Sequence, residues 1–241
     1  MSNPGTRAAP GRAGVALGAL LLVVPAGLAG CSGGSDTRAL TPRQTLAAAK
    51  RHLDATSGVR VGLSTGRLPA GVSGLLTADG IGTHDPAFTG RIKVSAGGVT
   101  ADASVVAVTG KVYAKLPFTT RFVAIDPADY GAPDPARLMN TEGGLSSLLT
   151  AATDVTKGDK VRQGKTVLTG YTATEPGSAV AVVIPSASSS ADFSATFTVT
   201  DRGRLAKAVL TGPFYPRAKG TDVTYTITFD DYGTTKKITA P

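Results

Sequence analysis

Apolar and polar side chains alternate with a period of two along most of the chain, and this alternation is the strongest constraint on its fold. In segment 59–64, Val59, Val61 and Leu63 occupy every second position. The same alternation returns in segments 92–96, 103–107, 112–116, 167–171, 193–199, 206–210 and 225–229. Such a strand buries one face and exposes the other. Gly- and Pro-rich turns separate several of the segments, so the pattern predicts an antiparallel meander of about eight to ten strands.

Only a few short helices are predicted beside these strands. Thr41 is a good N-cap and Pro42 suits the first position of a helix, which we expect to end at Ser57-Gly58. Shorter helices are expected at 134–139, at 144–152 and, where the pattern also allows a strand, at 179–184. These helices have narrow apolar stripes, so each must lie on a larger apolar surface.

The interior must consist mainly of small aliphatic side chains, because aromatic residues make up only 5% of the chain and tryptophan is absent. A sheet of this size curls, and the few helices cover its apolar face thinly. Two outcomes stay open on the pattern alone. One is an ordinary packed core, and the other is a hollow of about 300–1,000 Å³ lined by aliphatic groups, as in ligand sites. We predict an α+β, mainly β fold around a strongly curved sheet.

The N-terminal segment has the features of a cleaved signal. Arg7 and Arg12 precede an apolar run at 15–24, and Leu28-Ala29-Gly30-Cys31 follows. The apolar run is shorter than the ~20 residues that span a bilayer, and the last four residues resemble the lipobox of bacterial lipoproteins. We therefore expect residues 1–30 to be removed, Cys31 to be acylated and residues 31–40 to form a tether before the domain 41–241. An uncleaved anchor and an ordinary secretory signal are the alternatives.

Net charge limits the kinds of binding partner that we expect, and cysteine content limits the disulfides that can form. The formal net charge is +8 and Cys31 is the single cysteine. No cluster of Lys and Arg stands out in the sequence, so a nucleic-acid partner is not expected. An anionic membrane surface is a better match for this mild excess of positive charge. With Cys31 joined to lipid, no disulfide can form within the chain, and core packing must hold the domain together.

No enzymatic activity, metal or cofactor is expected. Gly62–Gly66 matches G-x-S-x-G, but a nucleophilic serine in that motif requires a strand followed by a helix, and here a turn and another strand follow Ser64. His52 and His84 have no repeating spacing that would suggest a metal site. Three aspartates superficially resemble a calcium loop without its spacing or its terminal glutamate: Asp126, Asp129 and Asp134.

Several motifs occur in a defined order along the chain. They are GKVYAKLP at 110–117, IDPA at 125–128, DPARL at 134–138, GLSSLL at 144–149, and DYG at 231–233 before KKIT at 236–239. Together with the lipobox, this order resembles the LppX/LprA/LprF/LprG family of actinobacterial lipoproteins over nearly the whole chain. Tyr232 stands where that family usually has tryptophan, and Phe118 and Phe122 lie where another tryptophan is common. These exchanges keep an aromatic side chain.

The resemblance implies a fold and a function. The fold is a strongly curved antiparallel half-barrel, similar in shape to the LolA/LolB carriers, with helices on its concave face enclosing an apolar cavity. The function is that of a lipoprotein on the extracytoplasmic face of the cell membrane, which carries glycolipids, triacylglycerol or related long-chain lipids across the envelope. One branch of the family works beside a major-facilitator transporter.

Candidate cavity residues follow from the apolar faces of the predicted strands and helices. They are Ile92, Val94, Val105, Val112, Ala114, Leu116, Leu138, Leu145, Leu148 and Leu149. Two other functions remain open. The chain could be a surface adhesin or structural module with a solid core, or an accessory subunit of a membrane transporter that carries nothing itself.

Overall fold

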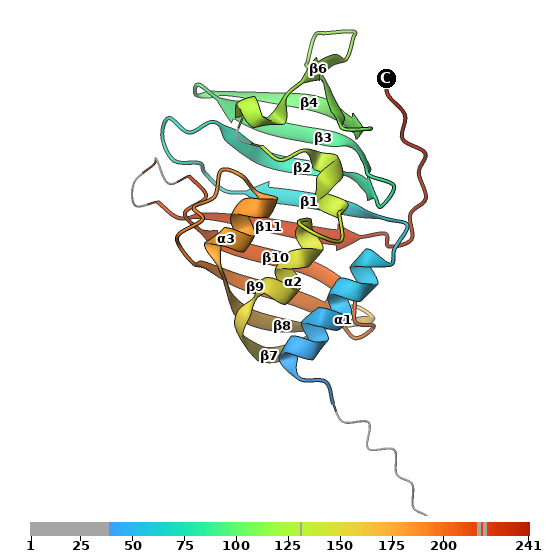
Figure 1. Ribbon diagram of the computed structural model, residues 1–241, viewed down its shortest axis with the longest axis vertical. Helices are drawn as coiled ribbons and strands as arrows, with labels where there is room; N and C mark the ends of the chain where they lie inside the picture. Colours follow the sequence, from blue (N-terminus) through green and yellow to red (C-terminus); the bar gives the residue numbers. More distant parts are fainter. Residues whose placement is uncertain (1–38, 131, 216–217, 219–220) are drawn as a thin grey trace, which may run out of the picture. The chain divides into compact units, whose positions relative to one another are not determined.

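An antiparallel sheet of eleven strands forms the framework of the protein (Figure 1). The computed structural model describes residues 39–130, 132–215, 218 and 221–241. The first six strands are β1 (Gly58–Thr65), β2 (Gly74–Thr83), β3 (Ala87–Ala96), β4 (Val99–Val108), β5 (Lys111–Lys115) and β6 (Val123–Ile125). The other five are β7 (Thr153–Gln163), β8 (Thr166–Glu175), β9 (Phe193–Thr200), β10 (Leu205–Gly212) and β11 (Val223–Asp230).

The sheet is built from two meanders that meet at the centre. Its strand order is β6-β5-β4-β3-β2-β1-β11-β10-β9-β8-β7. Every strand therefore pairs with its sequence neighbours except where the two meanders join. There β1 pairs with β11, and Val61 lies opposite Phe229. The sheet does not close, so β6 and β7 are its two edges. This arrangement confirms the predicted antiparallel meander and open, curved sheet.

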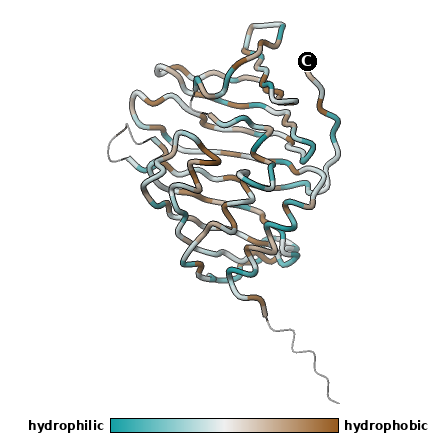
Figure 2. Tube along the Cα trace, in the orientation of Figure 1, coloured by the Kyte–Doolittle hydropathy of each residue, from teal (hydrophilic) through white to brown (hydrophobic). Residues whose placement is uncertain are grey.

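Each central strand buries one face, as the sequence pattern predicts. On β9, Phe193, Ala195, Phe197 and Val199 are buried. The intervening serine and threonines of β9 are exposed or half-buried on the other side, where threonine suits a solvated strand. Figure 2 shows the alternation of hydrophobic and hydrophilic residues along the strands. The apolar faces of the central strands lie toward the helices, and we call this side of the sheet the concave face.

All the helices lie over one face of the sheet (Figure 1). They are α1 (Pro42–Asp54), the 3₁₀ helices η1 (Pro127–Tyr130), η2 (Pro135–Met139) and η3 (Leu145–Ser147), then α2 (Leu148–Ala151) and α3 (Gly177–Val183). The α1 N-terminus is fixed by a capping box between Thr41 and Gln44. At η2 the predicted cap is present, because the Asp134 side chain accepts a hydrogen bond from the backbone N–H of Ala136. Segment 179–184, for which we favoured a helix, forms most of α3.

Three strands, β2, β6 and β7, lie outside the eight segments in which the sequence shows alternation. The sequence pattern did not define β7, because almost all of its residues are exposed and an edge strand needs no buried face. β2 carries glycine at positions 74, 80 and 82, which breaks the apolar alternation. Among the described residues, no helix combines the length and the hydrophobicity that crossing a membrane requires.

Candidate functional site

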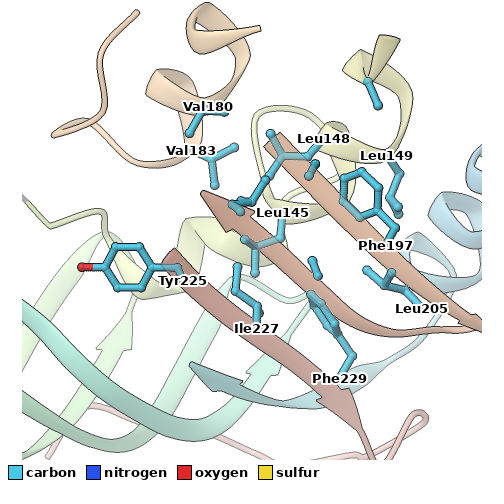
Figure 3. Packing of buried hydrophobic residues seen from close by; sticks show 14 of the residues in the cluster. Leu145, Leu148, Leu149, Val180, Val183, Phe197, Leu205, Tyr225, Ile227 and Phe229 are labelled. Atoms are coloured by element: carbon cyan, nitrogen blue, oxygen red, sulfur yellow. The ribbon is translucent and has the colours of Figure 1, made fainter. Parts of the chain in front are cut away.

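The larger of two apolar clusters lies between the helices and strands β1 and β8–β11. Its helical side comes from α1, η2, η3, α2 and α3, and Figure 3 shows the side chains of η3, α2 and α3 pointing toward those of the sheet. The residues labelled there are Leu145, Leu148, Leu149, Val180, Val183, Phe197, Leu205, Tyr225, Ile227 and Phe229. All are buried. This part of the concave face is therefore well covered by its helices.

A smaller cluster lies on the other half of the sheet. Phe88, Val105, Ala107 and Val112 pack there against Ala136 of η2. Ile92 and Ile125 are only partly buried beside them. Five residues of 3₁₀ helix are thus the main cover of strands β3–β5.

Glycines let the cover approach this half of the sheet closely. A Cβ at Gly82 would lie 2.6 Å from Met139 Cγ of η2, and one at Gly90 would lie 2.8 Å from Cζ of Phe88. A Cβ at Gly80 would clash with the Phe88 ring. These glycines provide the space that the Phe88 ring and the Met139 side chain fill.

Half-buried aliphatic residues lie between the two clusters. In the strand register Leu63 is opposite Ala78, Ala78 opposite Ile92, and Ile92 opposite Ala103. Leu63, Ala78 and Ile92 are each only half-buried. We call this row the apolar seam. Its side chains carry no hydrogen-bonding group, so it offers a smooth surface without directional contacts.

A groove of about 480 Å³ opens between the η1–η2 segment and α3. Its apolar wall includes Pro133, Leu138, Val182 and Pro185, and its polar groups include Asp134, Arg137 and Glu142. The volume lies within the range of about 300–1,000 Å³ that is usual for small-molecule sites. Leu138 also packs against the larger cluster, so η2 borders both the groove and the covered core.

A second, polar pocket of about 370 Å³ adjoins the groove. Asp54, His84, Asn140, Thr141 and Glu142 line it, and the groove shares Asn140 and Glu142. Behind it, Lys50 Nζ lies 2.6 Å from Asp54 Oδ2 and donates a 2.7 Å hydrogen bond to the Thr141 carbonyl oxygen. Lys50 thereby ties α1 to the segment that separates the two pockets.

The structure contains one buried carboxyl group that the sequence analysis did not predict. Glu175, the last residue of β8, is 0% exposed, and neither carboxyl oxygen has a hydrogen-bond partner among the described residues. Burial raises the pKa of Glu175 to about 8. In the sequence Glu175 precedes Pro176-Gly177, a context that suggests an exposed turn rather than a core position.

The predicted cavity residues are divided between the two clusters. Leu145, Leu148 and Leu149 are buried in the larger one, Val105 and Val112 in the smaller one, and Ala114 is also buried. Ile92 lies in the seam, Val94 is half-buried on the same strand, and Leu138 lines the groove. Leu116 differs from the expected buried position because β5 ends at Lys115, which leaves Leu116 48% exposed. Sequence reasoning did not single out Val182 and Pro185 of the groove.

The residues weighed for catalysis lie apart from these pockets, except His84. Ser64 is exposed on β1, opposite Thr77 and Thr226, and His52 is exposed on α1. His84 Nε2 is 2.8 Å from the carbonyl oxygen of Leu53. Within the described ranges, no group of three or more His, Cys, Asp or Glu side chains is arranged to hold a metal ion. Cys31 lies outside the described residues.

Known proteins share this arrangement. A family model described as LppX_LprAFG lipoprotein matches residues 41–239. The crystal structure of LprF from Mycobacterium bovis matches with a TM-score of 0.67 at 15% identity, covering 83% of this chain and 96% of that chain. LppX from Mycobacterium tuberculosis matches with a TM-score of 0.60 at 14% identity, covering 82% and 98%. No curated protein sequence matches the chain. The two crystal structures establish a common fold.

Proposed function

The chain belongs to the LppX_LprAFG family of lipoproteins, and from this premise we propose that it binds long-chain acylated lipids, such as glycolipids or triacylglycerol, and carries them across the cell envelope. The observation that carries the proposal is the apolar concave face, with a half-buried seam on its strands and a groove beside the thin cover above it. Acyl chains are the ligands that match an aliphatic surface without hydrogen-bonding groups.

The cover at η2 is the part that lipid tails would displace. Three residues of η2 contact different parts of the structure. Ala136 packs in the smaller cluster, Leu138 lines the groove, and Met139 packs in the larger cluster. The helix has only five residues, and few backbone hydrogen bonds resist its movement. Moving η2 away from the strands would join the groove to the seam and expose one continuous apolar channel.

The energetics suit a carrier rather than a permanent binder. Each methylene group that leaves water for an apolar site contributes about 0.8 kcal/mol. The tails begin in a bilayer, however, so exchanging one apolar environment for another leaves the transfer near balance. Because the free energy of transfer from bilayer to protein is close to zero, the protein can release the lipid to an acceptor. Residues such as Ile92 and Leu138 would contact the tails without holding them by directional bonds.

Acylation of Cys31 would keep the carrier at its source membrane. The proposed product lacks residues 1–30 and is held by a tether of residues 31–40 on the extracytoplasmic face. Two or three acyl chains give stable anchoring, whereas one gives marginal binding. A major-facilitator transporter that delivers lipid to this face is the partner that the resemblance implies.

Lipid extraction tests the proposal. The domain 39–241 without its anchor, purified from a lipid-containing host, should release long-chain lipid into organic solvent, as detected by mass spectrometry. Ile92→Trp fills the seam and should lower the lipid-to-protein ratio several-fold. Ser95→Trp, on the same strand with the opposite orientation, is the control and should keep the ratio. Wild-type protein free of lipid, or equal ratios in the two variants, would refute binding at the seam.

A further inference from the structure

The turn between β5 and β6 carries a concentration of exposed apolar side chains. Of the eight large hydrophobic residues that are exposed in the described part of the chain, three lie in this short segment. Leu116 is 48% exposed, Val123 is 53% exposed, and Phe118 is fully exposed. We call 116–123 the hairpin tip. Leaving these three apolar side chains exposed to water is unfavourable. The tip therefore matches an apolar phase better than it matches solvent.

The backbone of the tip holds Phe118 outward under strain. Phe118 has φ 65°, a left-handed conformation that bulky residues rarely adopt. The turn is closed by Thr119, whose backbone N–H donates to the Leu116 carbonyl oxygen at 3.2 Å and whose hydroxyl donates to the same atom at 2.8 Å. Strain of this kind gathers at functional positions, and its effect here is to present an aromatic ring to the surroundings.

Basic residues from separate strands surround the tip on the convex side of the sheet. In the register Arg91 lies opposite Ser104, and Ser104 opposite Lys115, which aligns the two cations across β4. Lys93 and Arg121 complete the group. Acidic neighbours offset only part of it, because Asp102 lies 3.7 Å from Lys93 while Asp79 is engaged by Arg60 at 2.7 Å. The surface is positive overall.

We propose that the hairpin tip docks onto a lipid bilayer with anionic headgroups. Phe118 and Leu116 enter the boundary between headgroups and acyl chains, and the cations around the tip contact the headgroups. The position suits a protein with this groove, because only the three-residue strand β6 separates the tip from Asp126 and Ala128 in the groove wall. The proposal goes beyond lipid carriage and does not depend on a bound lipid.

The opposite edge of the sheet offers a rival surface. On β7, Val161 is 62% exposed between Lys160 and Arg162, so it also combines an apolar side chain with positive charge. It is a single side chain in the part of β7 that pairs regularly with β8, without the aromatic ring or the strained turn. β7 and β6 lie at opposite ends of the strand order, so a bilayer in contact with one edge strand can be distinguished from a bilayer in contact with the other.

A tryptophan reporter tests whether the hairpin tip or β7 contacts the bilayer, because the chain has no tryptophan of its own. Phe118→Trp and Val161→Trp are made separately in the domain 39–241, and each is mixed with phosphatidylcholine vesicles with or without phosphatidylglycerol. We expect the emission of Phe118→Trp to shift to the blue with the anionic vesicles, and less so as salt rises. Val161→Trp should keep the emission of an exposed indole. No shift at position 118, or a shift at position 161 alone, would overturn the proposal.

Vesicle co-sedimentation gives an independent measurement. Phe118→Ser should weaken partitioning onto anionic vesicles about tenfold, as expected for losing an aromatic side chain from an apolar phase. Replacing Lys115 and Arg121 by Gln should weaken it about fivefold per charge at low salt. Val161→Ser is the matched control and should bind like the wild type. Far-UV circular dichroism and thermal unfolding verify that each variant is folded. Equal binding of Phe118→Ser and the wild type would contradict the proposal.

Discussion

Glu175 lies opposite Phe193 at the end of the β8–β9 ladder, and both side chains are buried. The Phe193 ring takes the space that a Cβ at Gly212 of the next strand would need. Neither oxygen of that carboxyl has a hydrogen-bond partner among the described residues. Burial is the single cause of its raised pKa, which means that no nearby charge compensates for ionisation.

Glu175→Gln should remove a pH dependence of stability. The folded-state pKa of Glu175 is about 8, compared with an ordinary value of 4.5. Between these values the folded protein holds the proton more tightly than the unfolded chain, so this group makes the wild type less stable as pH rises from about 4.5 to about 8. The loss amounts to a few kcal/mol, because each pKa unit corresponds to about 1.4 kcal/mol. Urea unfolding across this pH range measures it.

The control for this prediction is Glu142→Gln, because Glu142 is an exposed carboxylate. That variant should keep the wild-type pH dependence, whereas Glu175→Gln should be nearly flat across the same range and more stable than the wild type above it. An unchanged slope in Glu175→Gln would show that Glu175 is already paired or solvated in the folded protein.

Sequence reasoning succeeded where burial follows a regular period. The alternation on β9 and β11, and the Thr41 cap of α1, are decided by neighbours along the chain. It failed where position depends on distant partners. Glu175 is buried where the end of β8 pairs with Phe193 of β9, and Arg91 and Lys115 come together only through β4. The division of the cavity candidates between two clusters likewise depends on where η2 lies, which no local pattern specifies.

Gly80→Ala should destabilise the domain. The added methyl group would collide with the Phe88 ring and lie 2.6 Å from the Thr89 carbonyl oxygen, and overpacking of this kind costs about 1–3 kcal/mol. Thermal or urea unfolding measures the change. Gly66→Ala is the matched control, because a Cβ there has nothing within 4 Å and should leave the stability close to that of the wild type. A neutral Gly80→Ala would mean that Phe88 moves freely.

Cys31→Ala should release the protein from membranes. The thiol of Cys31 is the proposed acylation site, and without acyl chains the apolar contribution to anchoring is lost. Fractionation of cells, followed by mass measurement of the protein, detects both the shift in location and the missing lipid. Ser32→Ala, one residue further along, is the control and should stay with the membranes. Membrane partitioning of Cys31→Ala at the wild-type level would contradict acylation at this residue.

Lys50→Met should weaken the attachment of α1 to segment 141–146, which follows the cover helix η2 in the chain. The Lys50 ammonium group is the donor that joins α1 to the segment 141–146, through the Thr141 carbonyl oxygen at 2.7 Å and Ser146 Oγ at 3.4 Å. Methionine keeps the length of the side chain but cannot donate, which leaves Asp54 without its ion pair. Hydrogen bonds from a charged group contribute about 1.5–3 kcal/mol, so urea unfolding should show a loss of that order. Arg51→Met, at an exposed position of the same helix, should be nearly neutral.

The same variant separates a local effect on the cover from general instability. If the cover must move to admit lipid, Lys50→Met should take up a fluorescent long-chain fatty acid from vesicles faster than the wild type. Gly62→Ala provides the comparison, because a Cβ there would lie 2.6 Å from Thr228 Oγ1 on the face of the sheet opposite the cover, so overpacking at this position lowers stability away from the cover. Faster uptake in Lys50→Met alone would link the contact between α1 and segment 141–146 to opening. Equal uptake in both variants would mean that uptake follows overall stability, and that the contact between Lys50 and Thr141 does not control the cover.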